Sequence, residues 1–185
     1  MLERGVFRLA YERVMEDPRT FLVGGGLLVL LNLASSGLLI GPTLVGISRA
    51  VLKRQRGEAV EFADLFYGFD DFGRNFLAGF LYGLGVAAGV LFFFLPGLVF
   101  GAIFFPVFPI LAQKSMPVPD AFEAARHLTL PLLVEQTVVF TLALILAGSG
   151  LFLFVIGIAV TLTLAVVALV LAYEEVARGG QPAVA

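Results

Sequence analysis

Three long stretches of this chain contain no charged residue. They run from Thr20 to Ser48, from Asn75 to Gln113 and from Gln136 to Tyr173, and all 12 Lys and Arg residues lie outside them. A helix needs about 20 mostly apolar residues to cross the hydrocarbon core of a bilayer. The second and third stretches are each long enough for two crossings. The pattern predicts helical hairpins whose charged ends lie on one side of a membrane.

The two longer stretches each contain one turn signal. The candidates are Leu95-Pro96-Gly97 and Gly148-Ser149-Gly150, because glycine and proline interrupt helices and neither segment is charged. Pro106 and Pro109 lie within the helix after the first turn, so we expect a kink there, with neighbouring helices satisfying the freed carbonyl groups.

The first stretch admits two interpretations. The turn candidate Asn32–Gly37 divides it into two helices of roughly 15 to 18 residues, at or just below the usual span length. Both flanking basic groups then lie in the cytoplasm, in keeping with the excess of Lys and Arg in cytoplasmic loops. The alternative is one full span followed by a half-embedded helix from Pro42 to Arg54. We favour the hairpin.

Composition argues against a soluble fold. Hydrophobic residues make up 59% of the 185 residues and charged residues 14%, against about 25% charged in soluble domains. A folded chain of this size keeps a large exposed surface, so a soluble domain cannot bury this much apolar material. We therefore predict an all-α integral membrane protein with six transmembrane helices as three helical hairpins, joined by short interfacial helices, in a single membrane domain over residues 20–175.

The two ends of the chain are predicted to differ from this domain. Apolar residues recur at helical spacing over residues 2–16 with charged residues between them. Residues 1–19 are therefore predicted to form an amphipathic interfacial helix along the membrane surface. Asp17-Pro18 is a helix-start signal for the first hairpin. Residues 176–185 are predicted to form a flexible tail.

Two segments connect the hairpins, Gln55–Arg74 and Lys114–Glu135, and each has an apolar helical face. The first carries a stripe of phenylalanines, and the second carries charged residues beside its apolar face. We take both as a candidate interaction surface for lipid or protein. Its residues are Phe62, Phe66, Phe69, Phe72, Asp120, Glu123 and Arg126.

The first connecting segment also gathers acidic residues just after a basic group. The acidic residues are Glu61, Asp64, Asp70 and Asp71, and the basic residues are Lys53, Arg54 and Arg56. Acidic groups near an anionic leaflet are unfavourable unless basic groups cover them. One hypothesis is that this segment docks on the basic end of the preceding helix, with the Phe side chains in the interface. The alternative is a solvated charged face.

The sequence offers little material for catalysis. It has no Cys, and its one His, His127, has only Glu123 one turn away. No metalloprotease, nucleophile-elbow or phosphate-loop motif is present. We predict no catalytic, cofactor-binding or metal-binding residue, and a protein that is not an enzyme. Glu135 is the candidate intramembrane polar residue. One interpretation is a ligand for a proton or cation; the other, which we favour, is a side chain that reaches the membrane interface.

Glycines four residues apart recur in the apolar stretches, a spacing that lets helix backbones approach closely in lipid. The pairs are Gly37 and Gly41, Gly79 and Gly83, Gly85 and Gly89, and Gly97 and Gly101. These glycines allow helices to pack within one monomer, as we favour, or between the subunits of a homo-oligomer. The net charge of −2 does not indicate nucleic acid. The expected partners are membrane lipids and a membrane or cytoplasmic protein.

Several loop motifs follow one another in a fixed order. They are Gly41-Pro42, Gly46, Arg56-Gly57-Glu58, the run from Phe62 to Phe69, Leu95-Pro96-Gly97, Pro106, and the run from Asp120 to Arg126. In these motifs the chain resembles a group of uncharacterised bacterial six-span membrane proteins that includes the membrane domain fused to some glycerophosphodiester phosphodiesterases. The resemblance implies the bacterial inner membrane, six spans and cytoplasmic termini. It implies no catalytic residue.

Two functions follow as expectations. The first is a non-enzymatic integral membrane module acting through lipid or protein contacts at its cytoplasmic face. The alternative is a transporter or permease-like protein for an apolar or amphiphilic substrate. Prolines and glycines in the spans favour transport, whereas the scarcity of polar residues within the spans opposes it.

Overall fold

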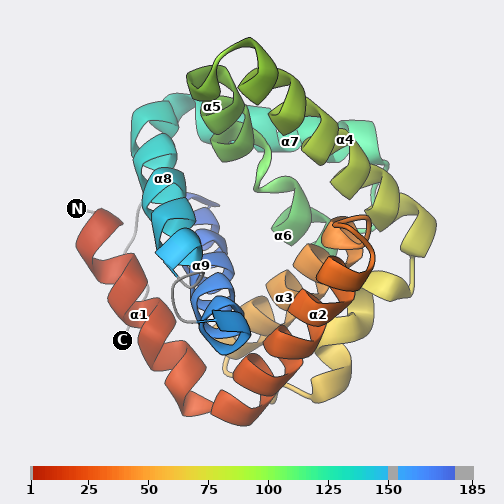
Figure 1. Cartoon of the computed structure of the whole chain (residues 1–185), viewed down its shortest axis with the longest axis vertical. Helices are drawn as coiled ribbons and strands as arrows, with labels where there is room; N and C mark the ends of the chain where they lie inside the picture. Colours follow the sequence, from red (N-terminus) through yellow and green to blue (C-terminus); the bar gives the residue numbers. More distant parts are fainter. Residues whose placement is uncertain (1, 150–153, 178–185) are drawn as a thin grey trace.

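The computed structural model describes residues 2–149 and 154–177, and the regular structure in this part of the chain is helical (Figure 1). The helices pair as antiparallel neighbours around a common centre. In chain order they are α1 (Leu2–Glu16), η1 (Arg19–Gly24), α2 (Gly25–Ala34), α3 (Ile40–Gln55), η2 (Phe62–Phe69), α4 (Phe72–Phe92), α5 (Phe94–Phe104), α6 (Val107–Gln113), α7 (Val118–Thr129), η3 (Leu130–Leu132), α8 (Leu133–Ser149) and α9 (Phe154–Ala177).

Three helices of the described residues are long and apolar enough to cross a membrane. They are α4, the run Phe94–Gln113 formed by α5 and α6, and the continuous run Val118–Gly148, which comprises α7, η3 and α8 up to Gly148. Arg19–Ala34 and Thr161–Glu174 are shorter apolar helices. The all-helical prediction is therefore confirmed, and three of the six predicted spans have the length and hydropathy of a span.

The hairpin of α4 and α5 is closed by glycines. A Cβ atom on Gly89 would collide with the backbone of Gly97, so the two helices touch backbone to backbone. The break between them falls at Phe93, which is extended (φ −166°, ψ 140°), just before the predicted turn at Leu95-Pro96-Gly97. Pro96 instead lies in the first turn of α5, where a missing N–H leaves no hydrogen bond unmade.

The first charge-free stretch forms two helices, which both interpretations include; the spanning hairpin stays a prediction. The chain reverses between α2 and α3 at Ser36 (φ 53°) and Gly37 (φ 83°), inside the predicted turn region. The start signal is also confirmed, because Asp17 Oδ1 accepts a hydrogen bond from the Thr20 backbone N–H at 3.2 Å. The helix that follows opens with one π-helical turn, η1.

Helix α3 is the centre of the fold. Its side chains from Gly41 to Leu52 are buried, with the exception of Arg49, and it packs against η2, α4, α6 and α9. Gly46 lies against the backbone of Leu65, and Gly68 lies against the backbone of Pro42. These contacts place η2 directly along α3.

The predicted proline effect is confirmed in the α5–α6 run. Helix α5 ends at Phe104 and α6 begins at Val107, with Pro106 between them. Of the predicted turn Gly148-Ser149-Gly150, the first two residues end α8, and Gly150 lies outside the described residues. Of the predicted tail, residues 176 and 177 belong to α9, and residues 178–185 lie outside the described part of the chain.

The amphipathic N-terminal helix packs on the protein. The apolar side chains of Val6, Ala10 and Val14 are buried, and α1 lies along α9. Its apolar face is therefore covered by helix, whereas the sequence predicts that it faces the membrane surface.

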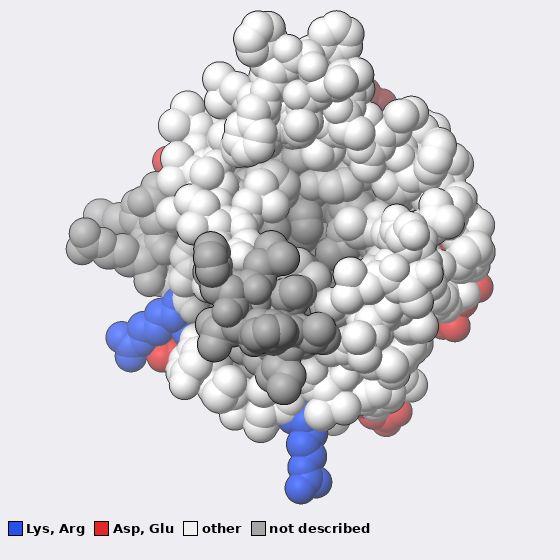
Figure 2. Space-filling view, in the orientation of Figure 1, with Lys and Arg blue, Asp and Glu red and all other residues white. Residues whose placement is uncertain are grey.

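Large apolar side chains cover much of the outside. The tip between α4 and α5 is the clearest case, since Leu91 is 86% exposed and Phe93 is 77% exposed. In Figure 2 the face toward the viewer is almost entirely uncharged, with Lys, Arg, Asp and Glu at its margin. Contiguous apolar surface of this kind is rare on soluble monomers and typical of surface that meets lipid.

Candidate functional site

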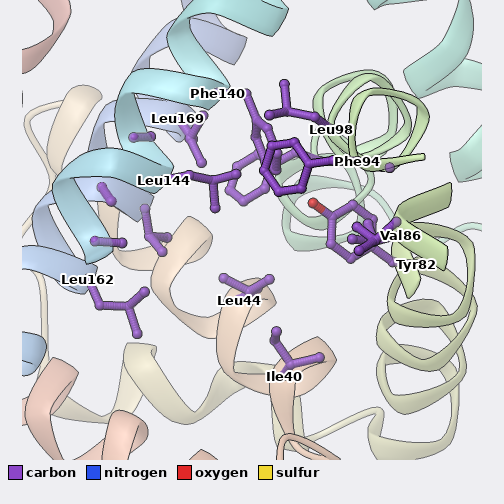
Figure 3. A pocket seen from close by; sticks show the side chains of 17 residues that line it. Ile40, Leu44, Tyr82, Val86, Phe94, Leu98, Phe140, Leu144, Leu162 and Leu169 are labelled. Carbon is purple, nitrogen blue, oxygen red and sulfur yellow. The ribbon is translucent and has the colours of Figure 1, made fainter. Parts of the chain in front are cut away.

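A cavity of about 250 Å³ lies among α3, α4, α5, α8 and α9. Figure 3 shows Leu44 of α3, Leu98 of α5 and Leu144 of α8 around it. In Figure 2 the surface is hollowed near its centre. The cavity is larger than the ~150 Å³ apolar cavity that binds benzene.

The wall of this cavity is apolar. Among the described residues that line it, Tyr82 alone has a polar side-chain atom, and its hydroxyl donates a hydrogen bond to the Gly101 carbonyl at 3.3 Å. The Tyr82 ring also meets Phe108 edge to face, with centroids 5.1 Å apart. Because the hydroxyl donates its proton to Gly101, the wall offers water one acceptor at most, and a buried water needs two to four polar partners.

Small side chains leave the space open. Ala143 and Ala147 of α8 and Ala165 of α9 face the cavity, although larger apolar residues lie on the same helices. Alanine is a good helix former, so these positions hold the helices without filling the centre. The sequence gives no sign of this site, because an alanine in an apolar helix looks like any other packing residue.

A charged cluster lies where η2 meets the end of α3. Lys53 Nζ is 2.7 Å from Asp64 Oδ2, and Arg49 Nε is 4.0 Å from Asp64 Oδ1. The Arg49 guanidinium also lies over the Tyr67 ring, 4.1 Å from its centroid. Asp64 further accepts a hydrogen bond from the Glu61 backbone N–H at 2.8 Å.

The contacts of Asp64 decide its titration. Partial burial acts to raise the pKa of its carboxyl, but the hydrogen bonds from Lys53 and from the Glu61 backbone outweigh burial and hold the pKa below its ordinary value. The carboxylate is therefore charged in the folded protein, and it fixes η2 on α3. Of the predicted contacts between the acidic segment and the basic helix end, the pair of Lys53 and Asp64 is present, whereas Arg54 pairs with Glu16.

Only part of the phenylalanine stripe packs on the protein, because Phe66 and Phe69 are half-buried against the core. Leu65 and Gly68 face α3, while Phe62 and Phe72 are each 45% exposed. Successive rings from Phe62 through Phe66 and Phe69 to Phe72 have centroids 5.5, 6.0 and 6.4 Å apart. The hypothesis is therefore wrong for Phe62 and Phe72, whose rings are exposed, whereas Phe66 and Phe69 do pack against the core.

The ring series continues beyond the predicted stripe onto α4. Phe76 and Phe80 follow Phe72 with centroids 5.6 and 6.3 Å apart. The three residues lie four apart in the sequence, a spacing that keeps them on one helix face. The sequence did not indicate these two as part of the stripe, because they lie after Asn75, inside a stretch with the composition of an ordinary span.

A second set of polar contacts joins α1, α3, α6 and α9 at the same margin. Glu16 Oε2 accepts a hydrogen bond from Arg54 Nε at 2.9 Å, so the end of α1 is tied to the end of α3. Arg56 donates to the side chain of Gln113 at 3.2 Å, and Gln113 contacts the Tyr173 hydroxyl at 3.4 Å. The charged ends of these helices therefore lie together.

The polar candidates on α7 are placed apart from the Phe stripe. Asp120, Glu123 and Arg126 are all exposed, and the opposite face of α7 buries Ala121 and Ala125. Within the described residues, the two halves of the candidate interaction surface share no hydrogen bond, ion pair or ring contact. His127 lies 3.6 Å from Glu123, with both side chains exposed.

Glu135 lies in the first turn of α8 and is exposed. Its neighbour Gln136 is buried. Because α7, η3 and α8 follow one another without a gap, Glu135 lies within a continuous helical run. Its place at the membrane interface stays a prediction.

No family model, curated protein or solved structure matches this chain. The resemblance to the six-span group therefore stays a prediction from the loop motifs.

Proposed function

We propose that this protein is a non-enzymatic bacterial inner-membrane protein that binds the apolar chain of a lipid or other amphiphile in its central cavity. The observation that carries this proposal is the cavity wall, which is apolar and has its one hydroxyl already engaged. A wall of this kind holds hydrocarbon and rejects polar groups, because a buried polar group without a partner is unfavourable.

The same proposal includes the membrane arrangement. Six helical segments enter the membrane as three hairpins from the cytoplasmic side, with both termini in the cytoplasm. The first hairpin is shallower than the others, because Gly41 meets α4 within its first two turns, at Asn75 and Gly79. Gly89 and Gly97, in contrast, meet close to the tip of their hairpin.

The binding energy comes from packing. An acyl chain leaves lipid to enter the cavity, so it gains no hydrophobic transfer energy; in a bilayer, association relies on van der Waals contact and polar groups. Contacts of about 0.1–0.2 kcal/mol per atom pair add up along a chain that is enclosed by leucine and phenylalanine. Empty space in the unliganded protein is what makes these contacts available.

A single tryptophan tests the cavity, because the chain contains no Trp. Phe140 lines the cavity and is 6% exposed, whereas Phe80 is 52% exposed on the outside of α4. Phe140→Trp and Phe80→Trp proteins in unbrominated vesicles are titrated with a long-chain alcohol that carries bromine on its chain. We expect Phe140→Trp fluorescence to be quenched saturably at low mole fraction and Phe80→Trp fluorescence to fall in proportion to mole fraction. Absence of quenching at Phe140→Trp would falsify the proposal.

Cysteine labelling tests the arrangement, since the chain has no Cys. We expect a membrane-impermeant maleimide applied from outside to label Ser149→Cys readily and Ser36→Cys slowly. A hairpin that enters less far from the cytoplasmic side leaves its turn inside the bilayer, farther from the outer surface. Equal labelling of both positions contradicts the shallow hairpin, and failure to label Ser149→Cys contradicts the three-hairpin arrangement.

Transport of the same class of molecule is the second candidate. The observation in its favour is the interruption of the α5–α6 run at Pro106 beside the cavity, since broken helices line the binding sites of many transporters. Exchange of the brominated alcohol between leaflets, faster with protein than without it, distinguishes transport from binding alone.

A further inference from the structure

A second cavity of about 320 Å³ lies beside the first, between α2, α3 and α9. Leu28 and Leu33 of α2 and Ile47 of α3 contribute to its wall. Like the central cavity, it exceeds the ~150 Å³ of an apolar cavity that binds benzene. The sequence gives no indication of it, because its wall comes from helices far apart along the chain.

The two cavities are separated by side chains alone. Four aliphatic residues line both of them: Ile40 and Leu44 on α3, and Leu162 and Val166 on α9. In Figure 3, Ile40 and Leu44 lie below the central cavity and Leu162 lies at its side. Aliphatic side chains change rotamer readily, so no backbone movement is needed for one molecule to contact both spaces.

The polar groups at the second cavity are uncharged. Asn32 and Thr43 line it and are hydrogen-bonded to each other, Asn32 Nδ2 to Thr43 Oγ1 at 2.8 Å, and Ser36 lies at the turn above them. None of the residues that line either cavity is ionisable at neutral pH. A charged head group at this depth would have no partner, and unpaired charge inside a membrane is strongly unfavourable.

We propose that the two cavities bind the two chains of one uncharged lipid, a diacylglycerol-like molecule whose hydroxyl head lies near Asn32, Ser36 and Thr43. This inference rests on the proposed function and names its ligand class. One chain occupies the central cavity, the other occupies the second cavity, and the four shared side chains lie between them. Two cavities of similar volume with a common wall fit a molecule with two similar chains joined at one end.

The test measures whether filling one cavity affects binding in the other. Leu28→Trp places a reporter in the second cavity. Ala143→Phe obstructs the central cavity only, because Ala143 lines that cavity and does not line the second one. The probes are a dibrominated diacylglycerol and a dibrominated single-chain alcohol in unbrominated vesicles. We expect Ala143→Phe to raise the half-quenching mole fraction of the diacylglycerol at least 10-fold and that of the alcohol less than 2-fold.

The control and the second reporter keep the result interpretable. Ile145→Phe adds a similar ring to the same helix at a position that is 64% exposed and lines neither cavity, so it leaves both probes unchanged. If Leu28→Trp does not fold, Leu33→Trp reports from the more exposed edge of the same cavity. Equal shifts for the two probes, or no shift, overturn the two-chain inference and leave the proposed function standing. Lack of quenching at Phe140→Trp overturns both, because each needs a chain in the central cavity.

Discussion

The two faces of α3 are packed in opposite ways. Pro42 and Gly46 face η2, where backbone meets backbone, whereas Ile40 and Leu44 face empty space on the other side. Residues two apart lie about 200° apart around a helix, so one short segment serves both faces. The close face fixes where η2 and α4 lie. The open face leaves room for a ligand without loosening the rest of the fold.

The largest effect is expected from a methyl group on the close face. In Gly46→Ala the added Cβ collides with the backbone of Leu65, which cannot move aside as a side chain does. We expect a loss of about 3 kcal/mol of stability, at the upper end of overpacking effects, and a lower midpoint of thermal unfolding in detergent. Gly83→Ala is the matched control, because a Cβ at Gly83 meets nothing within 4 Å.

The two glycine substitutions are expected to change the unfolding midpoint in opposite directions. Gly83→Ala gains helix propensity, up to about 1 kcal/mol, so its midpoint is expected to rise while that of Gly46→Ala falls. A Gly46→Ala protein as stable as the unsubstituted one contradicts the close contact between α3 and η2.

The ion pair at the same junction is expected to have an intermediate effect that depends on pH. Asp64 is 12% exposed and its pKa is lowered in the folded protein. Its stabilising contribution is therefore present above its ordinary pKa of about 4 and is lost as pH falls below that value. We expect Asp64→Asn to cost about 1–2 kcal/mol at pH 7.

The pH series separates this effect from a general loss of packing. The difference in unfolding midpoint between the unsubstituted protein and Asp64→Asn is expected to shrink between pH 5 and pH 3. A constant difference across that range rules out the carboxylate charge as its cause.

The smallest effect is expected on the open face. Ala143→Phe directs its ring into empty space, so the stability of the unliganded protein is expected to change by less than about 1 kcal/mol, far below the usual penalty for a ring added to a filled core. Thermal unfolding in detergent measures it. A loss as large as that of Gly46→Ala shows that the space is filled and removes the contrast between the faces.

The success of the sequence analysis varied with the range of the interactions involved. The reversal at Gly37 and the break at Pro106 were predictable because glycine and proline act on their own backbone. The pair of Lys53 with Asp64 was suggested by opposite charges on neighbouring segments. The outward direction of Phe62 and Phe72 was not predictable, because an aromatic stripe is compatible with either a docked or an exposed face.

The sequence by itself determined that the chain is helical and apolar, and that its charged residues lie outside three long charge-free stretches. These properties follow from composition and from the spacing of charges, glycines and prolines, which act locally. Only the tertiary structure decided that α1 lies on α9, that Gly46 lies against Leu65, and that alanines of α8 and α9 leave a cavity beside Leu44. Packing between helices distant in sequence depends on which faces meet, and an almost uniformly apolar helix carries no periodic signal to specify that.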